Sequence, residues 1–284
     1  MKLKYNDTIG IISPSGPVLD KESFFKNIET LKQKGFRVKV FPNALNNEGF
    51  LAGSDKERLD DLHAAFLDNE VNAILCSRGG YGAIRLLDFI DYDIIKNNKK
   101  LFIGSSDSSA FLAAFYSRAE LISLHAPMLL NGFCDLDIEK INNQKTIEPK
   151  KKHKVLFEGE AQGVLWGGNL ATIVSLFGAK NYLPKGDIIL FLEDICEPPY
   201  KIDRMLVEIY RNSDLKEKIK GIVFGEFLGI SKQELKEVEK TLCDFAQKIG
   251  VPCVYGFDIT HGKNNIAVPF GASAKLFGSK ICLL

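Results

Sequence analysis

The first half of the chain alternates strand-like runs with segments of helical periodicity, and this alternation restricts the fold more than any other feature. The strand-like runs lie at 8–13, 37–41, 72–77 and 101–104. The segments with apolar residues at helical spacing lie at 21–35, 55–68, 81–90 and 108–119. Strands that alternate with helices form βαβ units, which build a parallel sheet with helices on both faces. The sequence therefore predicts an α/β fold, in which ligands bind where strands end and helices begin.

A polar segment at 131–160, rich in Asn and Lys and containing Pro149, interrupts this alternation and is typical of a linker. Beyond it, helices are expected at 169–178, 200–212 and 232–248. From residue 154 onward strand-like runs are denser, at 154–158, 162–166, 188–192, 221–225, 252–256, 265–269, 274–277 and 280–283. We therefore predict three parts. They are an N-terminal parallel-sheet βαβ domain at 1–135, a linker at 136–160, and a strand-rich C-terminal α/β domain at 161–284.

Composition narrows the class of protein. The chain has 284 residues, of which 45% are hydrophobic and 26% charged, as in an ordinary globular protein with ample core. Its net charge of +1 gives no reason to expect nucleic acid or an anionic membrane as a partner. The N-terminal apolar run is too short for a signal peptide, and no run approaches 18 apolar residues. The six cysteines lack CxxC spacing, which favours buried thiols in a reducing compartment and so a cytoplasmic location.

The stretch FIGSSDSSAF (102–111) places several hydroxyls where a predicted strand meets a predicted helix. It resembles the G-x-S-x-G nucleophile elbow, but the last glycine is missing, so an α/β-hydrolase is not supported. A hydroxyl at Ser106 would still lie near free N–H groups of the helix, which can bind an oxyanion. The competing interpretation is that Ser106 or Asp107 is only a helix N-cap, and this stretch alone favours that interpretation.

A second strand-to-helix turn, SRGGYG (77–82), contains Gly79, Gly80 and Gly82. Glycines let a backbone approach a ligand closely, and successive N–H groups can form a site for an anion. The string is neither a P-loop nor G-x-G-x-x-G. It is either an ordinary glycine turn or a second donor of hydrogen bonds to an oxyanion.

Carboxylates and a histidine in the second half complete the candidate chemistry. Glu193 and Asp194 end a buried strand, with Glu197 just beyond, and they could orient a histidine or be merely exposed or capping. His261 is the one histidine in a Gly/Asn loop. The four histidines lack metal-ligand spacing, so we predict no metal and no cofactor. A serine, a carboxylate and a histidine are what a serine hydrolase needs, and here they would have to meet across two domains.

In their order and spacing, a set of short strings resembles the LD-carboxypeptidase family of serine peptidases, which includes the microcin C immunity peptidases. The strings are SRGGYGAIRLL, FIGSSDSSAFL, HAPM, GVLWGGNL, LFLEDICEPPYKIDRML and THGKNN. The likeness runs from IGIISPSGP to IAVPFGASAKL, nearly end to end. It implies a catalytic triad of Ser106, Glu193 and His261.

Further site residues follow from the same resemblance. It implies an oxyanion hole formed by the backbone N–H groups of Asp107 and Gly80. It also implies that Trp166 and Asn169, in the WGGN string, line the cleft. The chemistry of a guanidinium adds Arg78 as a candidate for binding a terminal carboxylate, with a structural role as the alternative.

The family cleaves the bond between meso-diaminopimelate and the terminal D-Ala of murein tetrapeptides, in the cytoplasm, during cell-wall recycling. The resemblance implies this murein peptide substrate and a homodimer. Two alternatives remain open. One is an amide hydrolase of a peptide–nucleotide toxin, in which Trp166 would stack on a nucleobase; the other is a protein that binds a peptide without cleaving it. Three positions depart from the family pattern and would alter the pocket: Ser105 replaces an aromatic residue, and Ala126 and Thr260 replace glycines.

Overall fold

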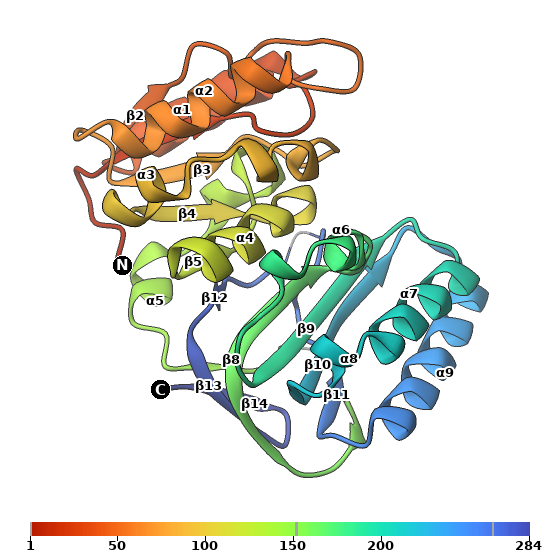
Figure 1. The fold of residues 1–284 in the computed structure, drawn as a ribbon. Helices are drawn as coiled ribbons and strands as arrows, with labels where there is room; N and C mark the ends of the chain where they lie inside the picture. The colour runs from red at the N-terminus through yellow and green to blue at the C-terminus, as the bar shows by residue number, and fades with distance from the viewer. Residues whose placement is uncertain (1, 151–152, 263) are drawn as a thin grey trace. The chain divides into compact units, whose positions relative to one another are not determined.

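The computed structural model describes residues 2–150, 153–262 and 264–284, and it divides the chain into two compact units, Met1–Asn143 and Gln144–Leu284 (Figure 1). The division falls inside the segment predicted as a linker. That segment is not irregular throughout, because it contains a short helix and two strands: α5 (Ile138–Asn142), β6 (Thr146–Ile147) and β7 (Lys154–Phe157). Residues 151–152 of the predicted linker lie outside the described residues.

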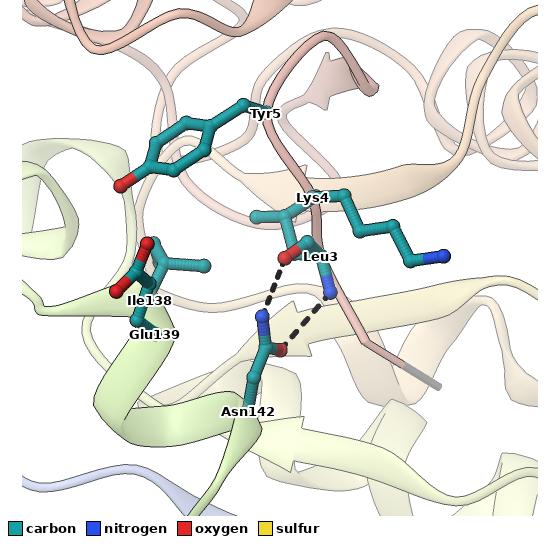
Figure 2. Close-up of a pocket in the computed structure, with 6 residues that line it drawn as sticks. All are labelled: Leu3, Lys4, Tyr5, Ile138, Glu139 and Asn142. Carbon is teal, nitrogen blue, oxygen red and sulfur yellow. Dashed lines mark hydrogen bonds between the residues drawn. The ribbon is translucent and has the colours of Figure 1, made fainter.

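Helix α5 belongs to unit 1 because its last residue holds the N-terminal segment. The Asn142 side chain accepts a hydrogen bond from the Leu3 N–H at 3.1 Å and donates to the Leu3 carbonyl at 2.6 Å (Figure 2). A pocket of about 170 Å³ lies at this junction, lined by Leu3, Lys4, Tyr5, Ile138, Glu139 and Asn142. Local periodicity cannot predict hydrogen bonds between a side chain and the backbone of a residue 139 positions away. This explains why unit 1 extends beyond the predicted boundary at 135.

Unit 1 contains a parallel sheet in the order β5-β4-β3-β1-β2, which confirms the predicted α/β fold class. The strands are β1 (Thr8–Ile12), β2 (Arg37–Val40), β3 (Ala73–Cys76), β4 (Leu101–Gly104) and β5 (Ser123–His125). The longer helices are α1 (Lys21–Gln33), α2 (Asp55–Leu67) and α4 (Ser109–Ala119). Strands β1 and β3 are buried along their whole length, as expected for central strands of a parallel sheet covered on both faces.

The predicted helix at 81–90 is wrong as a single element. The structure has 3-10 turns at Ala83–Arg85 and Leu87–Phe89, and then a separate helix, α3 (Tyr92–Asn97). The Asp91 carboxylate accepts hydrogen bonds from the N–H groups of Asp93 and Ile94, and so begins this new helix.

Unit 2 is built on a mixed sheet in the order β6-β14-β13-β8-β9-β10-β11-β7. Its longer strands are β8 (Glu160–Asn169), β9 (Ile188–Ile195) and β10 (Ile219–Leu228), and the shorter ones are β11 (Cys253–Tyr255), β13 (Ser273–Phe277) and β14 (Lys280–Leu283). Another strand, β12 (Val268–Phe270), precedes β13. The helices are α6 (Leu170–Ser175), α7 (Pro199–Arg211), α8 (Ser213–Lys216) and α9 (Lys232–Ile249), with α7 and α9 packed side by side (Figure 1).

The central strands of unit 2 carry the residues of interest. β8 and β9 run parallel and place Asn169 opposite Glu193. Gly167 makes this close approach possible, because a Cβ on it would lie 1.9 Å from the Phe191 carbonyl oxygen. Close packing of β8 against β9 is therefore enough to explain a glycine in the WGGN string.

Two further predictions concern the chain as a whole. None of the helices in the described residues is both long and apolar enough to cross a membrane. All six cysteines are free. Cys76, Cys134 and Cys253 are buried as expected, whereas Cys196 is exposed, so the expectation of buried thiols is wrong at that residue.

Candidate active site

Ser106 lies in the turn between β4 and α4 with φ at +57°, in the left-handed region that side chains other than glycine rarely adopt. It begins a 3-10 turn, Ser106–Ser108, that leads directly into α4. The neighbours Ser105, Ser108 and Ser109 are buried, whereas Ser106 is partly exposed. Backbone strain of this kind is typical of functional sites, where it holds one side chain in a defined direction.

The helix-cap interpretation of this turn has no supporting hydrogen bond among the described residues. The side chains of Ser105 and Ser108, at the two cap positions, make no capping bond. The buried Asp107 carboxylate instead accepts from the N–H of Ala83, in the neighbouring loop, at 2.8 Å. Burial raises the pKa of Asp107, although this hydrogen bond and the charge of Arg58 act in the opposite direction.

The glycine loop at 77–82 packs directly against the Ser106 side chain. A Cβ on Gly79 would lie 2.8 Å from the Ser106 Cβ and 2.9 Å from its Oγ, so only glycine fits. The Gly79 carbonyl accepts from the Gly16 N–H at 3.1 Å, which fixes the loop from its other side. Gly80 has φ at +119°, and its N–H has no acceptor among the residues that the structure describes.

This arrangement within unit 1 can stabilise an oxyanion. The Asp107 N–H lies in the first turn of a helical segment, where N–H groups have no intrahelical partner. The Gly80 N–H belongs to the loop that touches Ser106. Both predicted donors therefore lie on segments adjacent to the Ser106 side chain, as an oxyanion hole requires.

In unit 2, Glu193 and His261 form a hydrogen-bonded pair. Glu193 Oε2 lies 2.6 Å from His261 Nδ1, and Glu193 is 1% exposed near the end of β9. No partner is found for His261 Nε2 within the described ranges. With the Nδ1 proton donated to the carboxylate, Nε2 carries the lone pair that a general base needs.

The charge of Glu193 controls the pKa of His261. Burial lowers the pKa of the imidazole, but the hydrogen bond to Glu193 and the charges of Glu193 and Asp194 outweigh it, so the pKa lies above its ordinary value. A carboxylate that stabilises the imidazolium in this way plays the third role in a hydrolase triad.

The loop carrying His261 is braced by its own side chains. The buried Asn265 accepts from the Thr260 N–H at 3.1 Å, and the Thr260 hydroxyl accepts from the Gly262 N–H at 3.0 Å. Thr260, noted above as a departure from the family pattern, therefore stabilises the loop. Lys263 of the same string lies outside the described residues.

Asn169 is occupied by structural contacts. Its side chain caps α6 by accepting from the Thr172 N–H at 3.0 Å, and it donates to Asp194 at 2.7 Å. Asp194 also accepts from the N–H groups of Ala171 and Ile195. Burial and the neighbouring charge of Glu193 raise the pKa of Asp194 to about 6.

Trp166 is fully buried, with its ring 6.2 Å from that of Phe270. It exposes no surface on which a substrate group could stack. The structure therefore gives no support to the prediction that Trp166 and Asn169 contact substrate; packing and capping account for both.

The Arg78 guanidinium uses one of its nitrogens in a hydrogen bond to the backbone. Its Nη1 donates to the Pro17 carbonyl at 2.9 Å, and its guanidinium lies beside Gly16 and Gly80. This contact supports the structural alternative for Arg78, since it ties the 16–17 segment to the glycine loop.

Two groups that the sequence did not single out support these side chains: Asn265, which accepts from the Thr260 N–H beside His261, and the buried Arg58, which donates to Gly82 of the glycine loop. Gly79 was noted in the glycine turn, but its contact with Ser106 was not predicted. Neither Arg58 nor Asn265 carries a local sequence signal for this role, because both act through contacts that the fold creates. No three His, Cys, Asp or Glu side chains in the described part of the chain are grouped as metal ligands.

Comparison with known proteins identifies the family of both units. Family models for the LD-carboxypeptidase N-terminal and C-terminal domains match residues 9–126 and 162–276. The chain is 33% identical to a probable murein peptide carboxypeptidase of Bacillus subtilis, over 96% of this chain and 90% of that protein. It is 28% identical to the microcin C7 self-immunity protein MccF of Escherichia coli, over 95% of this chain and 90% of that protein.

Among solved structures, the muramoyltetrapeptide carboxypeptidase of Oxalobacter formigenes matches with a TM-score of 0.83 and 28% identity, and the match covers 97% of both chains. Both family models and a relative that is 33% identical thus span most of the sequence. The chain therefore belongs to the LD-carboxypeptidase family of peptidases.

Proposed function

We propose that this protein is a serine carboxypeptidase that releases the terminal D-Ala from murein tetrapeptide, at the L,D bond after meso-diaminopimelate. The observation that carries the proposal is the Glu193–His261 pair, with Nδ1 bound to a buried carboxylate and Nε2 unpartnered among the described residues. The strained turn that presents Ser106 beside the glycine loop supplies the matching nucleophile. The names of the Bacillus and Oxalobacter relatives support murein peptide as the substrate.

The proposed mechanism requires Ser106 Oγ to come within hydrogen-bond reach of His261 Nε2. Ser106 Oγ attacks the carbonyl carbon of the diaminopimelate residue, and its proton moves to Nε2. The oxyanion accepts hydrogen bonds from the N–H groups of Asp107 and Gly80, each worth about 3 kcal/mol.

Collapse of the tetrahedral intermediate breaks the C–N bond, and His261 gives its proton to the departing amine of D-Ala. Water, deprotonated by the same imidazole, then attacks the acyl-enzyme and regenerates Ser106. Glu193 holds Nδ1–H throughout and stabilises the imidazolium that forms in each half-reaction. The protein acts in the cytoplasm as a homodimer, and no step uses a metal or cofactor.

A second candidate is an amide hydrolase of a peptide–nucleotide, favoured by the 28% identity to MccF over 95% of this chain. In this candidate Trp166 would stack on a nucleobase. The full burial of Trp166 argues against that arrangement. The same triad would serve both substrates, so the choice between them rests on the substrate-binding surface.

A release assay separates the candidates. The purified protein is incubated with murein tetrapeptide ending in D-Ala, with the same peptide ending in L-Ala, and with a peptidyl–nucleotide, and free amino acid or nucleotide is measured. D-Ala release by the wild type and not by Ser106→Ala supports the proposal. Cleavage of the peptidyl–nucleotide alone indicates the second candidate, and binding without cleavage indicates a non-catalytic binder.

A further inference from the structure

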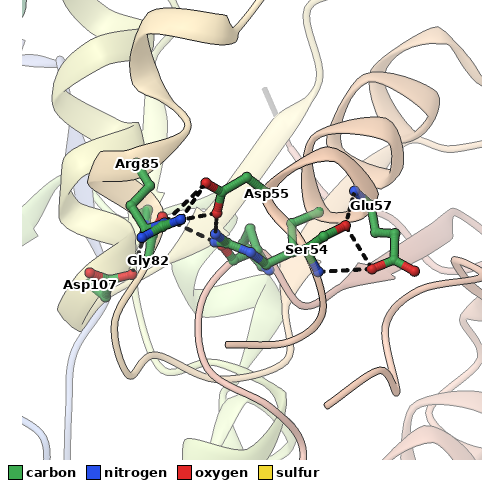
Figure 3. A network of polar contacts seen from close by, with 9 residues as sticks. Ser54, Asp55, Glu57, Gly82, Arg85 and Asp107 are labelled. Carbon is green, nitrogen blue, oxygen red and sulfur yellow. Dashed lines mark hydrogen bonds and ion pairs between the residues drawn. The ribbon is translucent and has the colours of Figure 1, made fainter. Parts of the chain in front are cut away.

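The peptide group that joins Gly82, the last residue of the glycine loop, to Ala83 is hydrogen-bonded through both its carbonyl and its N–H to buried charged side chains. The Gly82 carbonyl accepts a hydrogen bond from Arg58 Nη1 at 3.0 Å, and the N–H of the same peptide, at Ala83, donates to Asp107 Oδ2 at 2.8 Å. Gly82 and Asp107 are labelled in Figure 3. Arg58 is 1% exposed and Asp107 7% exposed. A peptide bound from both sides by ionisable groups of low exposure is far more restricted than an ordinary loop peptide.

Arg58 reaches this position from α2, and its other contacts keep it there. It donates to the Pro14 carbonyl and forms an ion pair with Asp55, at the start of the same helix. Asp55 also binds the partly exposed Arg85 (Figure 3). Taking a guanidinium out of water carries a large desolvation penalty, which these contacts offset only in part because Arg58 Nε has no partner among the described residues.

The absence of a side chain at Gly82 leaves room for the Arg58 guanidinium. Gly82 has φ at +130°, and a Cβ there would lie 2.7 Å from Arg58 Nη1, so any larger residue would displace the guanidinium. The Arg58 contacts therefore depend on Gly82 as much as the loop depends on Arg58.

The Gly82–Ala83 peptide connects the glycine loop to the turn that carries Ser106. On one side, Asp107 directly follows Ser106 in the chain. On the other side, Gly82 lies two residues after Gly80, whose N–H is the second proposed oxyanion donor. If the peptide shifts, the spacing between the glycine loop and the Ser106 turn shifts with it.

We propose that Arg58 is a positioning residue for catalysis: through the Gly82–Ala83 peptide and Asp107, it fixes the glycine loop against the nucleophile turn so that the oxyanion donors stay in register with Ser106. This inference rests on the proposed serine mechanism. It differs from a purely structural role in one respect. Arg58 should affect the reaction of Ser106 in molecules that are fully folded.

Arg58→Met tests the inference, because it keeps the length of the side chain and removes every donor. Arg58→Lys keeps the charge but replaces the planar fork by a single ammonium, which cannot reproduce the contacts with Gly82, Pro14 and Asp55 together. Arg85→Met is the matched control, since it removes the other guanidinium from Asp55 and keeps the backbone N–H of residue 85, which donates to the Gly82 carbonyl at 3.2 Å.

Three measurements are made on each variant: kcat and KM for D-Ala release, the rate of covalent labelling of Ser106 by a fluorophosphonate, and the melting temperature. Assays are run at least 15 °C below the melting temperature of the least stable variant. A displacement of about 1 Å in a catalytic group costs on the order of 10²-fold in rate. We expect Arg58→Met to lower kcat and the labelling rate by about 10–100-fold with little change in KM, Arg58→Lys to recover part of the loss, and Arg85→Met to match the wild type.

A folded Arg58→Met protein with wild-type kcat and labelling rate overturns the inference. If Arg58→Met does not fold, Arg58→Lys decides: reduced labelling supports the inference and unchanged labelling overturns it. If the wild type is labelled at Ser106 but releases no D-Ala, the proposed substrate is wrong, and the labelling rates still test the role of Arg58. If the wild type is neither labelled nor active, the serine mechanism fails and the inference fails with it.

Discussion

Replacement of Glu193 by glutamine isolates the contribution of the carboxylate to the chemistry of His261. The two side chains are nearly isosteric, so the packing around this 1% exposed residue is kept. The change removes the negative charge that lies 2.6 Å from His261 Nδ1. It also permits an amide N–H to face Nδ1, which favours the tautomer with the proton on Nε2, where it cannot act as a base.

The expected loss of kcat is large. Loss of the correct tautomer in a Ser-His-carboxylate triad reduces kcat by about 10⁴-fold, which corresponds to ~5.4 kcal/mol at about 1.36 kcal/mol for each tenfold change. A second effect concerns pH. Neutral His261 is the active form, so kcat/KM should rise with pH through the pKa of His261, which Glu193 holds above its ordinary value of 6.5.

In Glu193→Gln the burial of the imidazole remains and the opposing charge of Glu193 is gone. The pKa of His261 should then fall, and the residual activity should persist to lower pH than in the wild type. The assay is the pH dependence of kcat/KM for D-Ala release. Glu197→Gln is the matched control, because Glu197 lies on the same segment but pairs with Lys201 near the surface. A Glu193→Gln protein with kcat within tenfold of the wild type, or with an unmoved acid limb, refutes this assignment of the carboxylate.

Three other predictions concern the same reaction. Ser106→Ala should lower kcat by several orders of magnitude, and adding His261→Ala should cost little more because triad members act as a unit; additive losses in kcat would contradict the triad. Prolonged dialysis against EDTA should leave kcat unchanged, and a loss restored by zinc would show that a metal takes part. Peptides ending in D-Ala should be cleaved far faster than those ending in L-Ala, and equal rates would remove the case for an L,D-specific site.

The regular elements of the fold were predictable because their signals are local. The strand at 101–104 and the helix at 55–68 appear within one or two residues of β4 and α2, since burial and capping act over a few neighbours. The segment at 81–90 failed because its backbone depends on distant side chains. The contact from Arg58 to Gly82 spans 24 residues, and no periodicity encodes it.

The sequence predicted the residue types of the candidate site, but it did not predict the residues that hold those side chains in place. Glu193 and His261 are 68 residues apart, and residue types alone suggested that one of three nearby carboxylates could orient a histidine. The family resemblance selected Glu193, and the structure places it 2.6 Å from His261. The resemblance also assigned Trp166 to the cleft, and this assignment stays a prediction that the burial of the side chain does not support. The indole lies in the core of unit 2, where burial, a property of the packed chain, excludes it from solvent.

The left-handed backbone of Ser106 leads to a last prediction, which concerns stability alone. An L-residue at φ +57° carries a strain of about 1–2 kcal/mol that glycine does not. Glycine loses more backbone entropy on folding than alanine, by roughly 0.5–1 kcal/mol. The balance favours Ser106→Gly over Ser106→Ala by about 0.5–1 kcal/mol, or roughly 1–4 °C in Tm for a domain of this size.

Ser109 supplies the control, because its φ of −55° is helical and there the glycine variant should be the less stable, by about 1 kcal/mol. Both pairs are compared by thermal denaturation. If glycine is no more stable than alanine at position 106 while the Ser109 pair behaves as expected, the turn stores no strain, and the direction of the Ser106 side chain must be set by its contacts with the glycine loop.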